Sequence, residues 1–185
     1  MIAKTIKETD AHMDKSVSAL AHEFTTVRTG RASGAILEKV TVEYYGVPTP
    51  LMQLATISAP EPQMLLIQPY DKGSMTAIEK AIQSSGLGLN PANDGVVIRV
   101  PFPPLTEERR KDLVKLCKTY AEEARVAVRN IRRDANDKLK KAEREGEISQ
   151  DDLHRAETEI QKATDSHIVE IDETLKRKEA EIMEV

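Results

Sequence analysis

The chain has 185 residues, of which 39% are hydrophobic, and it carries 27 basic and 31 acidic side chains. Its length allows one large domain or two small ones, and 3% aromatic residues with no Trp disfavour an aromatic-rich sandwich. No apolar leader and no run of about 18 apolar residues occurs, so we expect a cytosolic protein without a membrane partner. The single cysteine, Cys117, agrees with a reducing compartment.

Residues 2–28 show the spacing of an amphipathic helix. Apolar side chains recur three, four and seven positions apart, at Ile6, Met13, Val17, Leu20, Phe24 and Val27. Gly30, Ser33 and Gly34 then interrupt the pattern, which predicts that the helix ends before them.

The next segment, residues 31–104, has the sequence pattern of a small α/β domain. Short runs rich in Val, Ile and Tyr predict strands over residues 40–46, 64–70 and 96–102. Residues 74–85 have helical spacing, and the GLGLNP sequence that follows them is typical of a helix stop and a turn.

Two more long helices are predicted in the remaining residues. Thr106 is a candidate N-cap for a helix that extends to about residue 144, where Gly146 interrupts it. Ser149, with Asp152 three residues later, restarts a helix. The predicted apolar seam of the second helix contains Leu113, Leu116, Tyr120, Ala124, Ala127, Ile131, Ala135 and Leu139, and that of the third contains Leu153, Ala156, Ile160, Ile168, Ile171, Leu175 and Ile182.

These elements predict an α+β chain with two domains. Residues 1–30 and 105–185 are expected to form a long antiparallel three-helix bundle, and residues 31–104 form a β-rich α/β domain inserted between its first and second helices. Because the insert is tethered by two short neighbouring segments, residues 29–34 and 101–104, we expect a two-strand hinge. The expected hinge residues are Thr29, Gly30, Gly34, Pro103 and Pro104.

Charge is distributed unevenly along the predicted bundle. Residues 106–145 carry 13 basic and 9 acidic side chains, whereas residues 146–185 carry 5 and 12. On a helical wheel with Arg125 at zero, the second helix has its apolar seam centred at about 240° and its cations between about 340° and 80°. We name these cations the basic ribbon: Lys111, Lys115, Lys118, Arg125, Arg129, Arg132, Arg133 and Lys140.

The basic ribbon has two interpretations. It is either an ordinary solvated helix face with i to i+4 ion pairs or a surface for an anionic partner. Arginine rather than lysine occupies its centre, and the planar guanidinium suits phosphate groups. Aromatic residues are not interleaved with the arginines, so backbone recognition of structured RNA is favoured over stacking on single-stranded bases.

Signatures of enzymes are weak in this sequence. No G-x-x-x-x-G-K-[ST] motif occurs, so we expect no nucleotide hydrolysis by the chain itself. The four histidines, His12, His22, His154 and His167, lack metal-ligand spacing, and no zinc site is expected. Cys117 has no nearby His in sequence to activate it. We therefore expect no catalytic residue, cofactor, metal or small-molecule substrate.

Several sequence segments resemble those of the bacterial ribosome recycling factor family. They are RTGRAS (28–33), VEYYG (42–46), LGLNP (87–91), PPLTEERRKDLVK (103–115) and EEARVAVRNIRRDANDK (122–138). The resemblance implies a three-helix bundle and a smaller domain in an L-shaped, tRNA-like outline with a flexible hinge. It also implies ribosome recycling after termination: with elongation factor G and GTP, the ribosome is split into subunits, and mRNA and deacylated tRNA are released. GTP would be hydrolysed by elongation factor G.

The same resemblance implies a binding site on the large ribosomal subunit. In the family the tip of the bundle contacts large-subunit ribosomal RNA, and the matching arginines are Arg28, Arg31, Arg129, Arg132 and Arg133. Arg132 is the residue that we expect to matter most, and the protein is expected to act as a monomer. Two alternatives stay open: a structural or chaperone-like helical protein that oligomerises through the seams of its first and third helices, and an enzyme that turns over without a partner.

Overall fold

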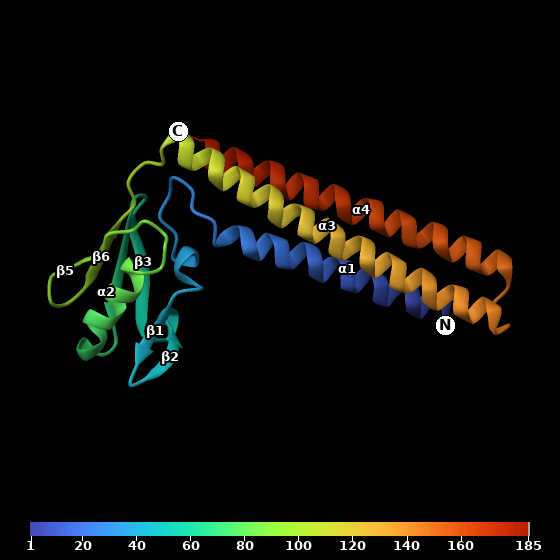
Figure 1. Ribbon diagram of the computed structural model, residues 1–185, viewed down its shortest axis with the longest axis horizontal. Coiled ribbons are helices and arrows are strands. Elements are labelled where there is room, and N and C mark those ends of the chain that lie inside the picture. Colours follow the sequence, from blue (N-terminus) through green and yellow to red (C-terminus); the bar gives the residue numbers. More distant parts are fainter. Residues whose placement is uncertain (185) are drawn as a thin grey trace. The chain divides into compact units, whose positions relative to one another are not determined.

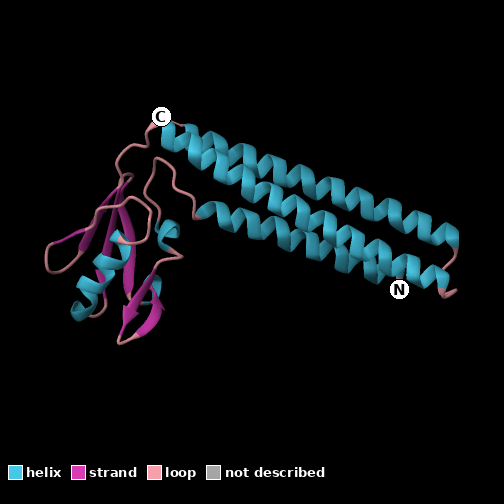
Figure 2. Cartoon of the chain, in the orientation of Figure 1, coloured by secondary structure: helices cyan, strands magenta, loops and turns pink. Residues whose placement is uncertain are grey.

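The computed structural model describes residues 1–184. Three long helices, α1 (Ile2–Thr25), α3 (Glu107–Arg144) and α4 (Gln150–Met183), lie side by side as a bundle, with α3 and α4 antiparallel (Figures 1 and 2). The predicted bundle with an inserted β-rich domain is confirmed. No helix within residues 1–184 is long and apolar enough to cross a membrane.

Contacts divide the chain into two compact units. The first contains Met1–Phe24 and Val114–Ala180, and the second contains Thr25–Leu113 with a short segment that starts at Glu181. Both predicted linkers, residues 29–34 and 101–104, therefore lie inside the second unit.

Local capping explains where the long helices begin and end. Thr106 Oγ1 accepts a hydrogen bond from Arg109 N at 3.1 Å, and Ser149 Oγ accepts one from Asp152 N at 3.0 Å, so both predicted N-caps are confirmed. Gly146 has a φ of 76°, and Glu147 N donates to Ala142 O at 2.9 Å. A glycine in this left-handed conformation ends α3 in a Schellman motif.

The bundle core consists of small and aliphatic side chains. Fully buried positions include Met13, Cys117, Ala121, Val128, Leu139, Ile160 and Ile171. Two buried threonine hydroxyls donate hydrogen bonds to backbone carbonyls one turn earlier in their helices. Thr9 Oγ1 donates to Thr5 O at 2.7 Å, and Thr164 Oγ1 donates to Ile160 O at 2.8 Å. The core is thus apolar or internally hydrogen-bonded over most of its length.

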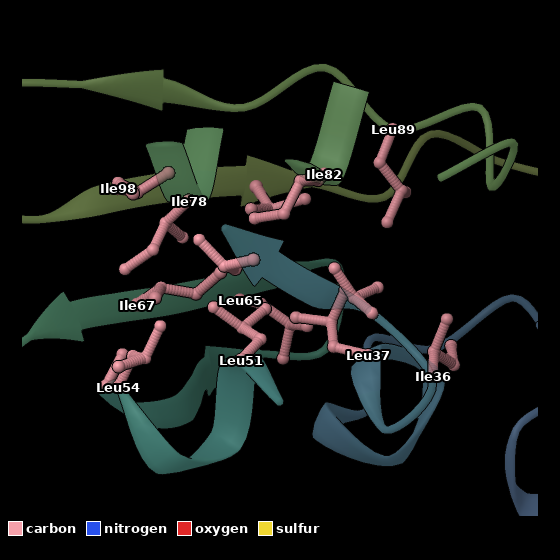
Figure 3. Packing of buried hydrophobic residues seen from close by; sticks show 14 of the residues in the cluster. Ile36, Leu37, Leu51, Leu54, Leu65, Ile67, Ile78, Ile82, Leu89 and Ile98 are labelled. Carbon is pink, nitrogen blue, oxygen red and sulfur yellow. The ribbon is translucent and has the colours of Figure 1, made fainter. Parts of the chain in front are cut away.

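The inserted domain contains two antiparallel sheets. Its four-stranded sheet has the order β3-β4-β6-β5, formed by Ala55–Glu61, Met64–Pro69, Ile98–Pro101 and Ala92–Asn93. Leu65, Ile67 and Ile98 from this sheet pack against Ile78 and Ile82 of helix α2, Met75–Gln83 (Figure 3). Three short 3-10 helices, η1 (Gly34–Leu37), η2 (Leu51–Gln53) and η3 (Lys72–Ser74), link these elements.

The second sheet is the hairpin of β1 (Thr41–Tyr44) and β2 (Val47–Pro50). Tyr45 and Gly46 at its tip have φ values of 50° and 76°, as a two-residue hairpin with both central residues left-handed requires. Leu51 N donates to Val40 O, so alternation along the strand turns the nitrogens of Pro48 and Pro50 away from β1. The prolines therefore occupy positions where no ladder hydrogen bond is lost.

Candidate nucleic-acid interface

The buried stripe of α3 is displaced from its predicted position. Leu116, a predicted seam residue, is 39% exposed, whereas Cys117, Ala121 and Val128 are fully buried. On the same wheel these three residues lie between about 280° and 320°. The placement of Leu116 in the seam was wrong because α3 packs against two helices, so its buried arc extends further toward Arg125 and Arg132.

Arg125 is consequently engaged inside the bundle. Its Nε and Nη2 both donate to Asp172 Oδ1 of α4, at 2.9 and 2.7 Å, and its Nη1 donates to Glu122 Oε2 at 3.0 Å. Burial lowers the pKa of Arg125, but the hydrogen bonds to Asp172 and Glu122 outweigh burial and raise it overall. With its side chain only 20% exposed, Arg125 fastens α3 to α4 rather than presenting a free cation.

Arg129 lies one turn further along α3 and shares the same acidic partner. Its Nη1 is 3.5 Å from Glu122 Oε1, at the outer limit of a hydrogen bond, and its side chain is 43% exposed. An exposed pair of this length contributes little to stability. The guanidinium of Arg129 can therefore be released to another anion at small cost.

Arg132 is half-buried and held from one side. Its Nη1 donates to Gln161 Oε1 of α4 at 3.0 Å, and Gln161 Nε2 in turn donates to Asp165 Oδ1 at 2.8 Å. The Arg132 Nε is buried without a hydrogen-bond partner among the described residues. Because Gln161 is neutral, the positive charge of Arg132 is fixed in place without a salt bridge to any residue that the structure describes.

Arg133 is the most available of the three central arginines. It is exposed, and it makes no side-chain hydrogen bond or ion pair within residues 1–184. Arg129, Arg132 and Arg133 therefore share one helix segment, but their side chains are held to different degrees. Arg132 is held by Gln161, Arg129 is loosely paired, and Arg133 is free of partners among residues 1–184.

Arg28 and Arg31 belong to the second unit. Arg28 Nη2 donates to Pro103 O at 2.6 Å, and its guanidinium carbon lies 5.4 Å from the centre of the Phe102 ring. Burial and the nearby charge of Arg109 lower the pKa of Arg28. Arg31 is exposed, and within residues 1–184 its backbone nitrogen alone is hydrogen-bonded, to Thr29 Oγ1 at 3.3 Å.

The predicted hinge residues lie in two connections that are fastened to one turn. Ala32 N donates to Pro62 O and Phe102 N donates to Gln63 O, both at 2.7 Å. Gly34 begins η1, where an added Cβ would lie 3.2 Å from Ile57 Cγ2, so this glycine permits close packing. Thr29, Gly30, Pro103 and Pro104 lie between these anchors and the long helices.

Sequence reasoning missed the way in which α4 neutralises part of the basic ribbon. The signal was the acidic excess of residues 146–185, which indicates that acidic side chains are available. The partner of Arg125 could not be chosen from it, because Asp172 is 47 residues away and the rotation of α4 is set by packing.

Comparison with known proteins gives consistent results. The family model described as ribosome recycling factor matches residues 20–183. The chain is 58% identical to the ribosome-recycling factor of Geobacillus sp. (strain WCH70) over 185 residues and all of both chains. It is 59% identical over 182 residues to that of Bacillus thuringiensis (strain Al Hakam), covering 98% of each.

A solution structure of ribosome recycling factor is similar with a TM-score of 0.74 and 46% identity, covering 100% of this chain and 98% of the other. A second similar chain is the T. thermophilus ribosome recycling factor, from a structure in which it and E. coli elongation factor G are bound to the E. coli post-termination complex. It has a TM-score of 0.66 and 50% identity, and both chains are fully covered. The three-helix bundle, the inserted β-rich domain and this agreement over the full length place the chain in the ribosome recycling factor family.

Proposed function

We propose that this chain recycles ribosomes after translation has terminated, as a translation factor without enzymatic activity of its own. The observation that carries the proposal is 58% identity over the whole length of a ribosome-recycling factor. The T. thermophilus relative is described as bound, with elongation factor G, to the post-termination complex. Elongation factor G is accordingly the partner that we infer here, with GTP consumed by that partner.

Within this function, the basic ribbon is the surface that binds ribosomal RNA of the large subunit. Arg132 supports this role because Gln161 holds its guanidinium by Nη1 without neutralising it. Arg133 and Arg31 are exposed, and Arg129 is only weakly paired. Arg28 already donates a hydrogen bond to Pro103, so its main contribution is to hold the two interdomain connections together. Attraction of phosphate is its secondary contribution.

Motion between the domains is the second part of the proposal. The hydrogen bonds of Ala32 and Phe102 to Pro62 and Gln63 fix one end of each connection, so residues 29–31 and 103–105, between these anchors and the long helices, are the segments about which we infer that the insert turns. The bundle would stay bound to RNA while elongation factor G pushes the insert about these segments. A push separates subunits only if the bundle is held.

The test of the function is a splitting assay with purified components. Post-termination ribosomes are mixed with this protein, elongation factor G and GTP, and subunit separation is followed by light scattering. We expect separation only when all three are present, and no GTP hydrolysis by this chain alone. Absence of splitting, together with no cosedimentation with large subunits, would refute the proposal.

A further inference from the structure

His167 of α4 is a buried histidine that faces three carboxylates of the bundle. Its side chain is 6% exposed, and its Nε2 lies 2.9 Å from Asp10 Oδ1 of α1. On the other side of the ring, Nδ1 lies 3.4 Å from Asp14 Oδ1 and 3.9 Å from Glu170 Oε2. All four residues belong to the first unit, and the three carboxylates are about half exposed.

The Nδ1 atom is the unusual part of this cluster. It is buried, and it makes no hydrogen bond to any residue of the described chain, although Asp14 and Glu170 lie close to it. A buried polar atom without a partner is costly, so natural structures rarely keep one without a reason. The carboxylates of Asp14 and Glu170, which water can reach, are the acidic groups nearest to this nitrogen.

The separations match those of a metal coordination sphere. One ligand atom from each of Asp14, His167 and Glu170 can be chosen so that all lie within 4.8 Å of one another. In a tetrahedral site with bonds of about 2.0–2.1 Å to nitrogen and oxygen, neighbouring ligand atoms are about 3.4 Å apart. The distance of 3.4 Å between His167 Nδ1 and Asp14 Oδ1 has this value, whereas Glu170 Oε2, 3.9 Å from Nδ1, would need to move closer.

Asp10 supplies the support that a metal-binding histidine needs. When its carboxylate accepts a hydrogen bond from Nε2, the neutral imidazole has its proton on Nε2 and its lone pair on Nδ1. This carboxylate on the far nitrogen fixes both the tautomer and the orientation of the ring.

We propose that Asp14, His167 and Glu170 bind a divalent transition-metal ion, and that zinc is the ion which this donor set fits best. One imidazole nitrogen and two carboxylate oxygens are zinc ligands, with a water in the fourth position, whereas Mg²⁺ and Ca²⁺ prefer oxygen alone. The bound ion would join α1 to α4. The sequence predicted no metal site because Asp14 and His167 are far apart in the chain.

The test is zinc titration of the full chain after dialysis against a chelator, by isothermal calorimetry at pH 7.5. We expect one equivalent to bind and the melting temperature to rise, because an ion that binds only the folded state stabilises it. Substitutions D14N and E170Q should each weaken binding at least tenfold.

Two matched controls separate this site from adventitious binding. H12Q removes an exposed histidine of α1 and E173Q an exposed carboxylate of α4, and both should bind zinc within twofold of the wild type. H167Q should abolish zinc binding. If this variant fails to fold, the wild type is studied by NMR instead, and the ring nitrogen resonances of His167 should shift when zinc is added. The proposal is overturned if the wild type binds no zinc, if D14N and E170Q bind normally, or if H12Q weakens binding as much as D14N does.

Discussion

Arg28 Nη2 donates a hydrogen bond of 2.6 Å to the carbonyl oxygen of Pro103, which lies 75 residues further along the chain. The same guanidinium covers the ring of Phe102, which is 1% exposed. One side chain thus ties together the two connections that lead into and out of the inserted domain.

Replacing Arg28 with Ala should therefore destabilise the connections. The loss of a hydrogen bond from a charged donor and of the contact with Phe102 predicts a fall of about 1 to 3 kcal/mol in the free energy of unfolding. Denaturant unfolding monitored by circular dichroism measures it. Arg31→Ala, at an exposed neighbouring position, is the control and should change stability little. Equal stability of the two variants would show that the hydrogen bond from Arg28 to Pro103 does not contribute to the free energy of unfolding.

Arg132→Ala should weaken binding to large ribosomal subunits by about 1.5 to 3 kcal/mol, the range for a hydrogen bond to a charged group. Arg132→Lys keeps the charge without the planar fork, so it separates geometry from charge. Cosedimentation at several salt concentrations measures both, and affinity should fall steeply with salt if phosphates are bound. Normal binding and recycling by a folded Arg132→Ala variant would exclude this residue as the anchor.

Arg125 and Arg133 should show opposite phenotypes although both belong to the basic ribbon. Arg125→Ala removes the bonds to Asp172 and Glu122, so it should lower stability while the exposed ribbon keeps its other cations. Arg133→Ala removes a free cation, so it should lower ribosome affinity without affecting unfolding. Thermal melting and cosedimentation of both variants decide the matter. A loss of stability in Arg133→Ala would contradict the assignment.

The buried thiol of Cys117 makes the free energy of unfolding depend on pH in the alkaline range. Burial raises the pKa of its thiol to about 11, from an ordinary value of 9.0. Because the folded pKa is above the unfolded one, the thiol contributes stability that is complete below about pH 9 and is lost as the pH rises through 11. Wild-type stability should thus fall more than that of Cys117→Ala between these values. At pH 8 a thiol reagent should modify the native protein far more slowly than the unfolded chain.

Local chemistry made part of this structure predictable. Thr106, Ser149 and Gly146 act on the backbone within a few residues of themselves, so the boundaries of α3 and α4 followed from the sequence. Strands β2 and β3 were missed, as was the two-residue strand β5. The first has proline at two of its four positions, and the second lacks apolar alternation because most of its residues are exposed.

The candidate site divides in the same way. That the arginines of α3 lie away from its apolar stripe follows from helix periodicity. Which of them are free does not, because the bonds of Arg125 to Asp172 and of Arg132 to Gln161 depend on the rotation of α4. The cluster around His167 likewise needs α1 and α4 in register. Packing between helices, rather than pattern within one helix, determines these contacts.

The prolines of β2 have a consequence for the behaviour of the protein at high concentration. Pro48 and Pro50 face away from β1, on the side where the two-stranded sheet has no further strand. An exposed strand margin with intact N–H groups recruits strands from other molecules and starts aggregation. Here the nitrogens of Pro48 and Pro50 carry no hydrogen, so the β2 edge of this hairpin, beside the exposed Tyr45 and Val47, offers no N–H donor at these two positions for intermolecular β-sheet growth.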